Sequence, residues 1–299
     1  MRVLLALFHN GFSHWMCSVD NQGIRFLYTK LIDAGDPINQ CGSIDFVDGY
    51  EVGVFERFPC DSIFALHNAP GLSAGKFMVL EGPVSLSIDF VDVTITGKGG
   101  HGGMPQPTRD PVVAVAAMVS ALQTIVARNV APDDVAVVSI GSIHGGAANN
   151  VIPSRATLSL NVRTKQPETR QLVERRIREL VTFTAQAYGV EAKIDYRELA
   201  PSLFNSPGPT ALARDACTEA VGQQNVETVG AGMTASEDFA WMMTAVPGCY
   251  LFLGNGGDTT GACSVHNPGY DFNDDILPAG AKAWVALVER YLRHESVRT

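Results

Sequence analysis

The sequence lacks a Cys-x-x-Cys pair, a basic patch and a long uninterrupted hydrophobic segment. Its six cysteines are scattered, which is typical of reduced thiols rather than of a disulfide framework. With 22 basic and 31 acidic residues, the net charge of -9 argues against a nucleic-acid-binding surface. No apolar run approaches the roughly 18 residues of a membrane span, and the apolar start is short for a secretory signal. We therefore expect a cytoplasmic protein with no nucleic-acid or membrane partner.

The 299 residues, 46% of them hydrophobic, are enough for two domains. Between residues 88 and 197 the pattern predicts the order β-α-β-β-α-β, which is that of a ferredoxin-like unit. One helix begins at Asp110-Pro111, and a second runs from Glu168 to Tyr188 and ends at Gly189. The four predicted strands are Phe90–Thr96, Val135–Ile143, Ala156–Arg163 and Val190–Tyr196.

The flanking residues, 1–87 and 198–299, carry helix signals and two strand candidates around Gly-rich loops. The simplest assembly makes them one α/β domain, interrupted by the ferredoxin-like unit at residues 88–197. Residues 1–49 show no strong periodicity and fit neither domain well. We therefore expect an α/β fold class, with a catalytic domain whose N-terminal part is incomplete and an inserted ferredoxin-like domain.

Two histidines occur in nearly the same context, far apart in the sequence. His67 lies in ALHNAP and His266 lies in SVHNP, each after a strand-like run. A neutral imidazole at a strand end is well placed to bind a divalent metal. The alternative is that each is a hydrogen-bonded loop residue. If both are ligands of one site, their nitrogens should lie within roughly 4–8 Å of each other.

Two further motifs carry polar groups. Four glycines surround His101 in GKGGHGGMP, where they would allow a partner or ligand to approach the backbone closely; a flexible hairpin is the alternative. Asn150, in NNVIP, precedes Arg163 at a strand end. An amide and a guanidinium on adjacent segments could together bind a substrate carboxylate.

Six segments in this order resemble the co-catalytic metallo-aminoacylase and carboxypeptidase family, in its branch of hippurate hydrolases and auxin-conjugate amidohydrolases. They extend from about Phe55 to Leu292, and they read FERFPCDSIFALHNAPG, GKGGHGGMP, DPVVAVAAMVSALQTIVARN, NNVIPSRATLSLNVR, ASEDFAWM and SVHNPGYDFND. The resemblance implies a metal-dependent hydrolase of N-acyl amino acids with two divalent ions, zinc or manganese, in each subunit. It also implies a homodimer formed through residues 88–197, the lid domain.

The resemblance also implies roles for single residues. His67 and His266 match two metal ligands, and His101 matches a lid histidine that enters the partner's site and polarises the scissile carbonyl. Asn150 and Arg163 match the groups that hold the substrate carboxylate.

Glu237 matches an acidic residue beside the metals, with a catalytic or ligand-orienting role. The alternative reading of Glu237 is a helix N-terminal carboxylate stabilised by the helix dipole.

The N-terminal fifty residues depart from the family pattern. The family has a Cys-Gly-His-Asp-Gly-His motif, of which Cys17 and Asp20 are the only echo, so Cys17 is a third candidate metal ligand. A Glu-Glu pair, the general base and a ligand, is replaced by Asn39 and Gln40, and an amide cannot act as a base. We therefore expect a truncated or degenerate N-terminus, fewer bound metals and impaired hydrolysis. The alternatives are a divergent but complete N-terminus, and a non-catalytic binding or dimerising protein that lacks a complete metal site.

Overall fold

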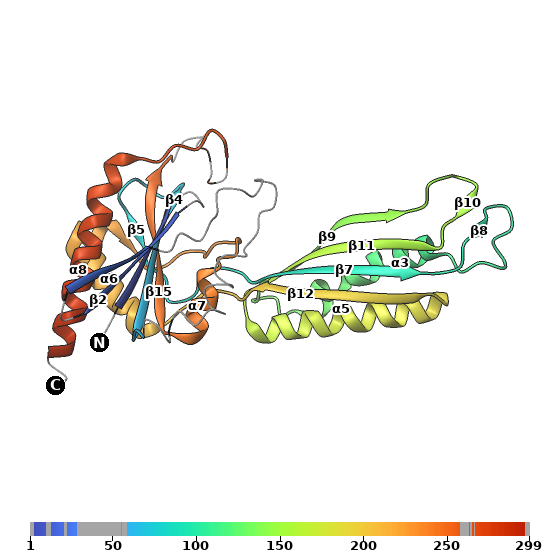
Figure 1. Ribbon diagram of the computed structural model, residues 1–299, viewed down its shortest axis with the longest axis horizontal. Coiled ribbons are helices and arrows are strands. Elements are labelled where there is room, and N and C mark those ends of the chain that lie inside the picture. Colours follow the sequence, from blue (N-terminus) through green and yellow to red (C-terminus); the bar gives the residue numbers. More distant parts are fainter. Residues whose placement is uncertain are drawn as a thin grey trace. The chain divides into compact units, whose positions relative to one another are not determined.

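The computed structural model describes residues 3–9, 13–20, 23–28, 55, 59–257, 263, 265 and 267–296 (Figure 1). Of residues 3–9, 13–20, 23–28 and 294–296, only the backbone is described. The chain divides into two compact units. Unit 1 comprises Met1–Val84, Leu203–Met233 and Asp238–Thr299, and unit 2 comprises Ser85–Ser202 and Thr234–Glu237.

Unit 1 is built on a seven-stranded mixed sheet. The strand order is β14-β5-β15-β4-β1-β2-β3. Within it, β4 lies parallel to both of its neighbours, β1 and β15. The strands are β1 (Val3–His9), β2 (Ser13–Asp20), β3 (Gly23–Tyr28), β4 (Ser62–Pro70), β5 (Phe77–Met78), β14 (Val226–Glu227) and β15 (Gly248–Gly256). A separate small pair joins β6 (Gly82–Pro83) to β13 (Phe204–Asn205).

Helices cover both faces of this sheet. Helices α6 (Pro207–Val221) and α8 (Leu277–Ser296) pack on one face, where they bury Phe64, Leu66 and Leu251 (Figure 1). Helix α7 (Phe239–Ala245) packs on the other face against Tyr250 and its neighbours. Because both faces of β4 and β15 are covered, these strands are near-continuous apolar runs rather than alternating ones. Short 3₁₀ turns lie at Gln223–Asn225 and Asp274–Ile276.

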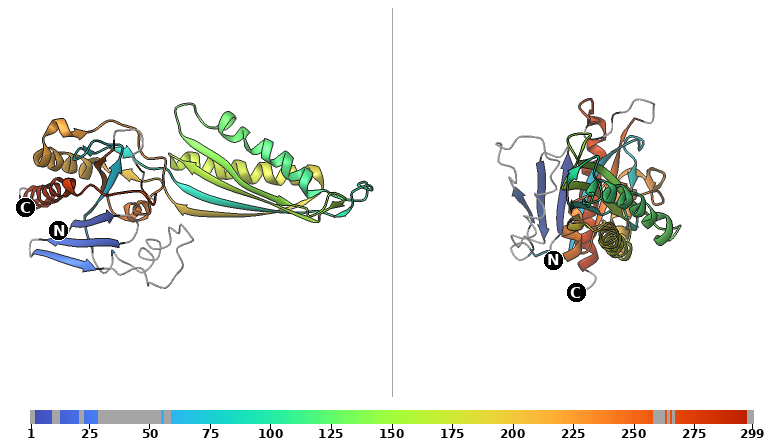
Figure 2. Two further views of the ribbon diagram at one scale, coloured as in Figure 1. Left: turned by 90° about the horizontal axis from the view of Figure 1, so that it is seen from above. Right: turned by 90° about the vertical axis from the view of Figure 1, so that its right-hand side faces the viewer.

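The N-terminal segment is more regular than its sequence suggested. Residues that we expected to fit neither domain form β1, β2 and β3, and Figure 2 shows them continuing the sheet of unit 1 beyond β4. A continuous apolar run such as that of β1 lacks the alternation that identifies a half-buried strand, so its periodicity says little. Residues 29–54, which include Asn39 and Gln40, lie outside the described residues.

Unit 2 pairs one antiparallel sheet with helices on a single face (Figure 2). Along the chain its main elements follow the order β-α-β-β-α-β, and the strand order in the sheet is β12-β7-β11-β9. These elements are β7 (Ile88–Thr96), α3 (Pro111–Leu122) with its continuation α4 (Thr124–Asn129), β9 (Ala136–Gly145), β11 (Arg155–Thr164), α5 (Pro167–Tyr188) and β12 (Glu191–Ala200). A second, two-stranded sheet pairs β8 (Gly100–His101) with β10 (Val151–Ile152).

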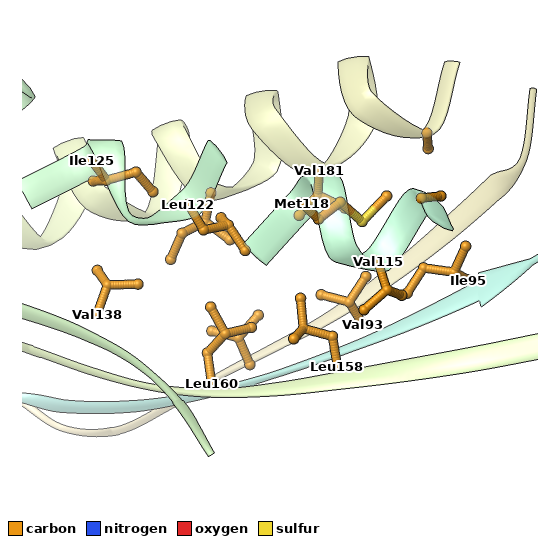
Figure 3. Packing of buried hydrophobic residues seen from close by; sticks show 14 of the residues in the cluster. Val93, Ile95, Val115, Met118, Leu122, Ile125, Val138, Leu158, Leu160 and Val181 are labelled. Carbon is orange, nitrogen blue, oxygen red and sulfur yellow. The ribbon is translucent and has the colours of Figure 1, made fainter. Parts of the chain in front are cut away.

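The core of unit 2 lies between its helices and one face of its sheet. In Figure 3 Met118 of α3 and Val181 of α5 meet strand residues such as Val93 and Leu158, and all four are fully buried. Buried and less buried residues alternate along β11. Every second residue of that strand therefore lies on the face that no helix of unit 2 covers. That uncovered face carries Arg163.

Within the described chain, one helical stretch, Pro111–Asn129, is long and apolar enough to cross a membrane by length and composition alone. The core helix of a globular unit meets the same criteria, and the buried side of this stretch packs into the core of unit 2. Ser120, Gln123 and Thr124 interrupt its apolar sequence. The stretch is therefore weak evidence for a membrane span.

Candidate functional site

His67 lies within the last part of β4, rather than just past a strand end as its sequence suggested. It pairs with Phe252 of β15 and is half-buried. Its Nδ1 lies 2.6 Å from the carbonyl oxygen of Asn68. A carbonyl oxygen only accepts hydrogen bonds, so Nδ1 carries the proton and the lone pair is on Nε2. A backbone hydrogen bond of this kind fixes the tautomer and ring orientation of a metal-binding histidine.

His266 lies outside the described residues, but the turn that follows it is described. The Nδ2 of Asn68 donates to the hydroxyl of Tyr270, and the backbone N–H of Tyr270 donates to the carbonyl of Asn267 at 2.9 Å. The residue after His67 is therefore joined to a turn that begins one residue after His266. The distance between the two histidines stays a prediction. Neither Asn68 nor Tyr270 was predicted from the sequence, where the only signal is their position in or just after the two His-Asn motifs.

One buried polar atom beside this contact lacks a hydrogen-bond partner. The Oδ1 of Asn68 is buried and has no hydrogen-bond partner, and an unpaired buried acceptor calls for an explanation. Burial, with a contribution from Asp271, raises the pKa of the Tyr270 hydroxyl, so it stays protonated at neutral pH.

The described side chains supply one candidate metal ligand, His67. Among them no group of three or more His, Cys, Asp or Glu could hold a metal ion. The backbone of Cys17 is described, and it pairs with Leu5, which in turn pairs with Phe64 of β4. Cys17 is thus about 10 Å from His67 along the strands and about 10 Å across the sheet. The expectation that Cys17 shares a metal with His67 conflicts with this register, because an extended strand separates residues by a fixed rise.

His101 is exposed in β8, and its tautomer is the opposite of that of His67. The backbone N–H of Gly103 donates to Nδ1 of His101 at 3.0 Å. Because Nδ1 is the acceptor here, the neutral ring carries its proton on Nε2. His67 can therefore offer a lone pair from Nε2, whereas His101 can donate a hydrogen bond from the same atom.

The glycines around His101 hold it against the segment that bears Asn150. A Cβ on Gly99 would lie 2.6 Å from the carbonyl oxygen of Ile152, and one on Gly102 would lie 3.0 Å from the backbone of Asn150. The N–H of Gly102 donates to the carbonyl of Asn150 at 2.7 Å. These glycines permit a close backbone approach between the two segments. His101 and Asn150 line the same hollow of about 810 Å³.

Asn150 and Arg163 do not meet within one chain, which corrects the expectation that they lie on adjacent segments. Asn150 lies beyond the first residue of β11, Arg155, and Arg163 is the penultimate residue of that strand. The eight steps from Arg155 to Arg163 span about 26 Å at the rise of an extended chain. One chain therefore presents His101 with Asn150 at one end of the unit 2 sheet and Arg163 at the other end.

Arg163 is half-buried, and its Nη1 donates to the carbonyl of Thr234 at 3.3 Å. Glu237 lies three residues further along that segment, just before Asp238, the N-cap of α7. Both readings of Glu237, a residue that acts beside the metals and a carboxylate near a helix N-terminus, are compatible with this position. Thr234–Glu237 belongs to unit 2 together with Arg163.

The sequence model of the Peptidase family M20/M25/M40 matches residues 36–290 of the chain. Hippurate hydrolase of Campylobacter jejuni is 37% identical over 243 residues, which are 81% of this chain and 62% of that protein. An IAA-amino acid hydrolase of Arabidopsis thaliana is 31% identical over 240 residues, which are 79% of this chain and 54% of that protein. The chain thus spans about half to three fifths of the length of these relatives.

Among solved structures, a Bacillus subtilis protein described as a dinuclear metal-binding peptidase of the M20 family is similar to this chain. It superposes with a TM-score of 0.67 at 28% identity, over 84% of this chain and 62% of that one. The mixed α/β fold is therefore that of M20 peptidases.

Proposed function

Because the chain belongs to the peptidase family M20/M25/M40, we propose that it is a metal-dependent amidohydrolase that cleaves the amide bond of N-acyl amino acids such as hippurate. Relatives named for hippurate and for an IAA-amino acid conjugate support this substrate class. Both compounds join an acyl group to an amino acid that keeps its free carboxylate. A cytoplasmic location, as expected from the scattered thiols, is part of the proposal.

The observation that carries the proposal is that the two histidines carry their ring proton on different nitrogens. With Nδ1–H bound to the Asn68 carbonyl, His67 offers Nε2 as a metal ligand. With Nδ1 accepting from Gly103, His101 offers an Nε2–H donor to a carbonyl oxygen that gains negative charge during hydrolysis. Amide hydrolysis by a metal enzyme needs both kinds of group.

His67 and His266 would hold a zinc or manganese ion, because imidazole nitrogen suits both metals. When bound, the metal supplies an activated water for attack on the amide carbonyl. The contact between Asn68 and Tyr270 supports placing the two His-Asn segments together. We propose that Glu237 acts as an acidic residue beside this site.

Unit 2 is, in this proposal, the ferredoxin-like lid and dimerisation domain. Because one chain separates His101 and Asn150 from Arg163, a single substrate would be held by Arg163 of one subunit and by His101 with Asn150 of the other. Apolar side chains exposed on α3 and on the edge strand β9 support a dimer surface, and these are Val112, Val113, Val137 and Ile143. An edge strand offers unpaired backbone groups to a second copy.

The N-terminal residues favour a second candidate, a non-catalytic binding or dimerising protein. Asn39 and Gln40 stand where a base and a ligand are expected, and the backbone register of β1, β2 and β4 places Cys17 away from His67. Loss of a general base typically lowers a rate by about 10²–10⁴. We therefore propose that hydrolysis by this chain is slow compared with that of its relatives.

The metal content of the purified full chain distinguishes the two functions. Between one and two equivalents of zinc or manganese per chain, with slow release of benzoate from hippurate, supports the amidohydrolase. Binding of hippurate without metal and without turnover supports the non-catalytic protein.

The sharing of residues between subunits is tested by mixing two inactive variants, His101→Ala and Arg163→Ala. If each site takes its histidine from the partner, half of a random mixture consists of hybrid dimers that hold one intact site. About a quarter of wild-type turnover should return. If both residues act within one chain, no hybrid site is intact and mixing restores nothing.

A further inference from the structure

The segment that follows His266 is held near the carboxyl ends of two neighbouring strands. Strands β4 and β15 are parallel, and Phe252 of β15 pairs with His67 of β4. The carboxyl ends of adjacent parallel strands lie at one edge of a sheet, where open α/β sheets place their ligands. Asn68 reaches the segment from β4, and Asn255 reaches it from β15.

Asn255 fixes the part of this segment that lies beyond Tyr270. Its Nδ2 donates to the carbonyl of Asp271 at 3.0 Å, and its Oδ1 accepts from the backbone N–H of Asn273 at 3.0 Å. Both polar atoms of the Asn255 side chain are therefore paired with the backbone. These contacts do not reach the part that is nearer to His266.

Asn68 holds that nearer part through the side chain of Tyr270. Its Nδ2 donates to the hydroxyl of Tyr270, and the backbone N–H of Tyr270 closes the turn that begins at Asn267. Within this turn the N–H of Gly269 donates to Oδ1 of Asn267 at 2.8 Å. The turn directly after His266 is thus closed by its own hydrogen bonds, and the hydroxyl of Tyr270 links it to β4.

Asn68 also acts on His67, through its backbone. Its carbonyl accepts from Nδ1 of His67 at 2.6 Å, which fixes the ring and leaves Nε2 for a metal. One residue therefore contacts the first candidate ligand through its carbonyl and the turn after the second through its amide. A substitution of Asn68 removes the second contact alone, because every residue has a backbone carbonyl.

The side chain of Asn68 is costly to the folded chain. It is only 6% exposed, and its buried Oδ1 has no hydrogen-bond partner. Leaving a buried acceptor unpaired is unfavourable, whereas apolar groups of the same shape can be neutral or stabilising. A leucine at this position would avoid the unpaired oxygen. Fold stability therefore does not account for the amide, and what the amide supplies is a donor to Tyr270.

We propose that Asn68 is a positioning residue for the two-histidine metal site and that it acts through the hydroxyl of Tyr270. The inference rests on the proposed function, in which His67 and His266 bind one metal ion. Asn68 keeps the turn after His266 beside the strand that carries His67 before the metal arrives. Binding then costs less ordering, which raises the affinity for the metal.

The test is a double-mutant cycle on zinc affinity, measured on the full chain by competition with a chelating dye. Asn68→Leu and Tyr270→Phe should each weaken zinc binding by about tenfold or more, as loss of a group that orients a ligand typically does. The double variant should bind zinc no more weakly than the weaker single variant, because both changes remove the same contact.

Two further measurements separate positioning from stability. In EDTA, without zinc, Asn68→Leu should melt at or above the wild-type temperature, since it loses the unpaired oxygen. Tyr188→Phe, which removes an exposed hydroxyl at the end of α5 in unit 2, is the matched control and should bind zinc as the wild type does.

The outcomes separate this inference from the proposed function. Wild-type zinc affinity in both single variants, with loss in His67→Ala, overturns the role of Asn68 and leaves the proposed function standing. Losses that multiply in the double variant also overturn it, because the two residues then act independently. The same holds if Asn68→Leu folds but melts well below the wild type in EDTA, since the amide then serves stability. A wild type that binds no zinc overturns both. Tyr270→Phe, at a less buried side chain, carries the test if Asn68→Leu does not fold.

Discussion

At the scale of single residues, the hydrogen bond of an imidazole decides what that histidine can do. His67 and His101 have the same chemistry in the sequence, but each has a different backbone partner. The Asn68 carbonyl makes Nδ1 of His67 a donor, and the Gly103 N–H makes Nδ1 of His101 an acceptor. One ring can therefore bind a metal through Nε2, while the other can donate from Nε2.

Replacing His67 with Ala should lower the metal content of the purified chain to well under half of the wild-type value. The reason is that loss of His67 from the proposed two-histidine site leaves too few ligands to retain the ion. His144→Ala is the matched control, because His144 is an exposed histidine of β9 that is outside the proposed site. Elemental analysis after dialysis measures the effect, and equal metal in wild type and His67→Ala would remove His67 from the site.

Burial raises the pKa of the Cys249 thiol from 9.0 to about 12. The folded state therefore favours the protonated thiol, and its contribution to stability is complete below pH 9. Above pH 9 the unfolded chain loses this proton first, so the contribution falls until the pH passes about 12. Urea unfolding at pH 8 and pH 10.5 should show a smaller loss of stability in Cys249→Ala than in wild type. Equal losses would contradict a buried, protonated thiol.

At the scale of secondary-structure elements, the helices and strands of unit 2 follow their sequence signals closely. The predicted helix Glu168–Tyr188 is α5 (Pro167–Tyr188), and Gly189 follows it with a φ of 64°. The predicted start at Asp110-Pro111 is confirmed, since Asp110 accepts from the Val112 N–H at 2.8 Å. The helix that follows breaks at Gln123 into α3 and α4, which the apolar spacing alone did not predict.

Gly189→Ala should destabilise the chain by about 1 kcal/mol, because an L-residue is strained in the left-handed region. Its Cβ would meet only the side chain of Arg109, which can move, so backbone strain dominates. Gly208→Ala is the control, since a Cβ there meets nothing within 4 Å and the residue lies in the first turn of α6. Urea unfolding should show a loss for Gly189→Ala and no loss for Gly208→Ala. Equal effects would show that the conformation of Gly189 is not what matters.

At the scale of the whole molecule, the separation of Asn150 from Arg163 makes a second copy of the chain part of the proposal. One chain carries the two groups at opposite ends of the unit 2 sheet, and no side-chain rotation closes a gap of about 26 Å. The proposed dimer would supply both groups to one substrate without bending the sheet.

Ile143→Glu should convert the dimer into a monomer at micromolar concentration, because a charge on the apolar β9 edge opposes its burial against a second copy. Phe183→Glu is the matched control, since Phe183 is 64% exposed on α5 and lies away from that edge. Light scattering during gel filtration distinguishes the two masses. A wild type that is already monomeric, or an Ile143→Glu variant that stays dimeric, would rule out this surface.

The sequence alone determined the elements of unit 2 and the candidate site residues. These elements have local signals: alternating apolar residues in strands, Asp-Pro at a helix start and Gly at a helix end. Such signals can be recognised in the sequence without knowledge of the fold. The strand β1 was not recognisable in the sequence, because a continuous apolar run has no distinguishing period.

Only the tertiary structure decided which groups meet. Residues 150 and 163 are close in sequence, yet an extended strand holds them apart, whereas Asn68 and Tyr270 are joined across 202 positions. The side of each imidazole that is protonated, and the contact of Asn255 with Asp271, likewise depend on backbone partners and strand ends. These are set by long-range hydrogen bonding and packing, which short motifs do not encode.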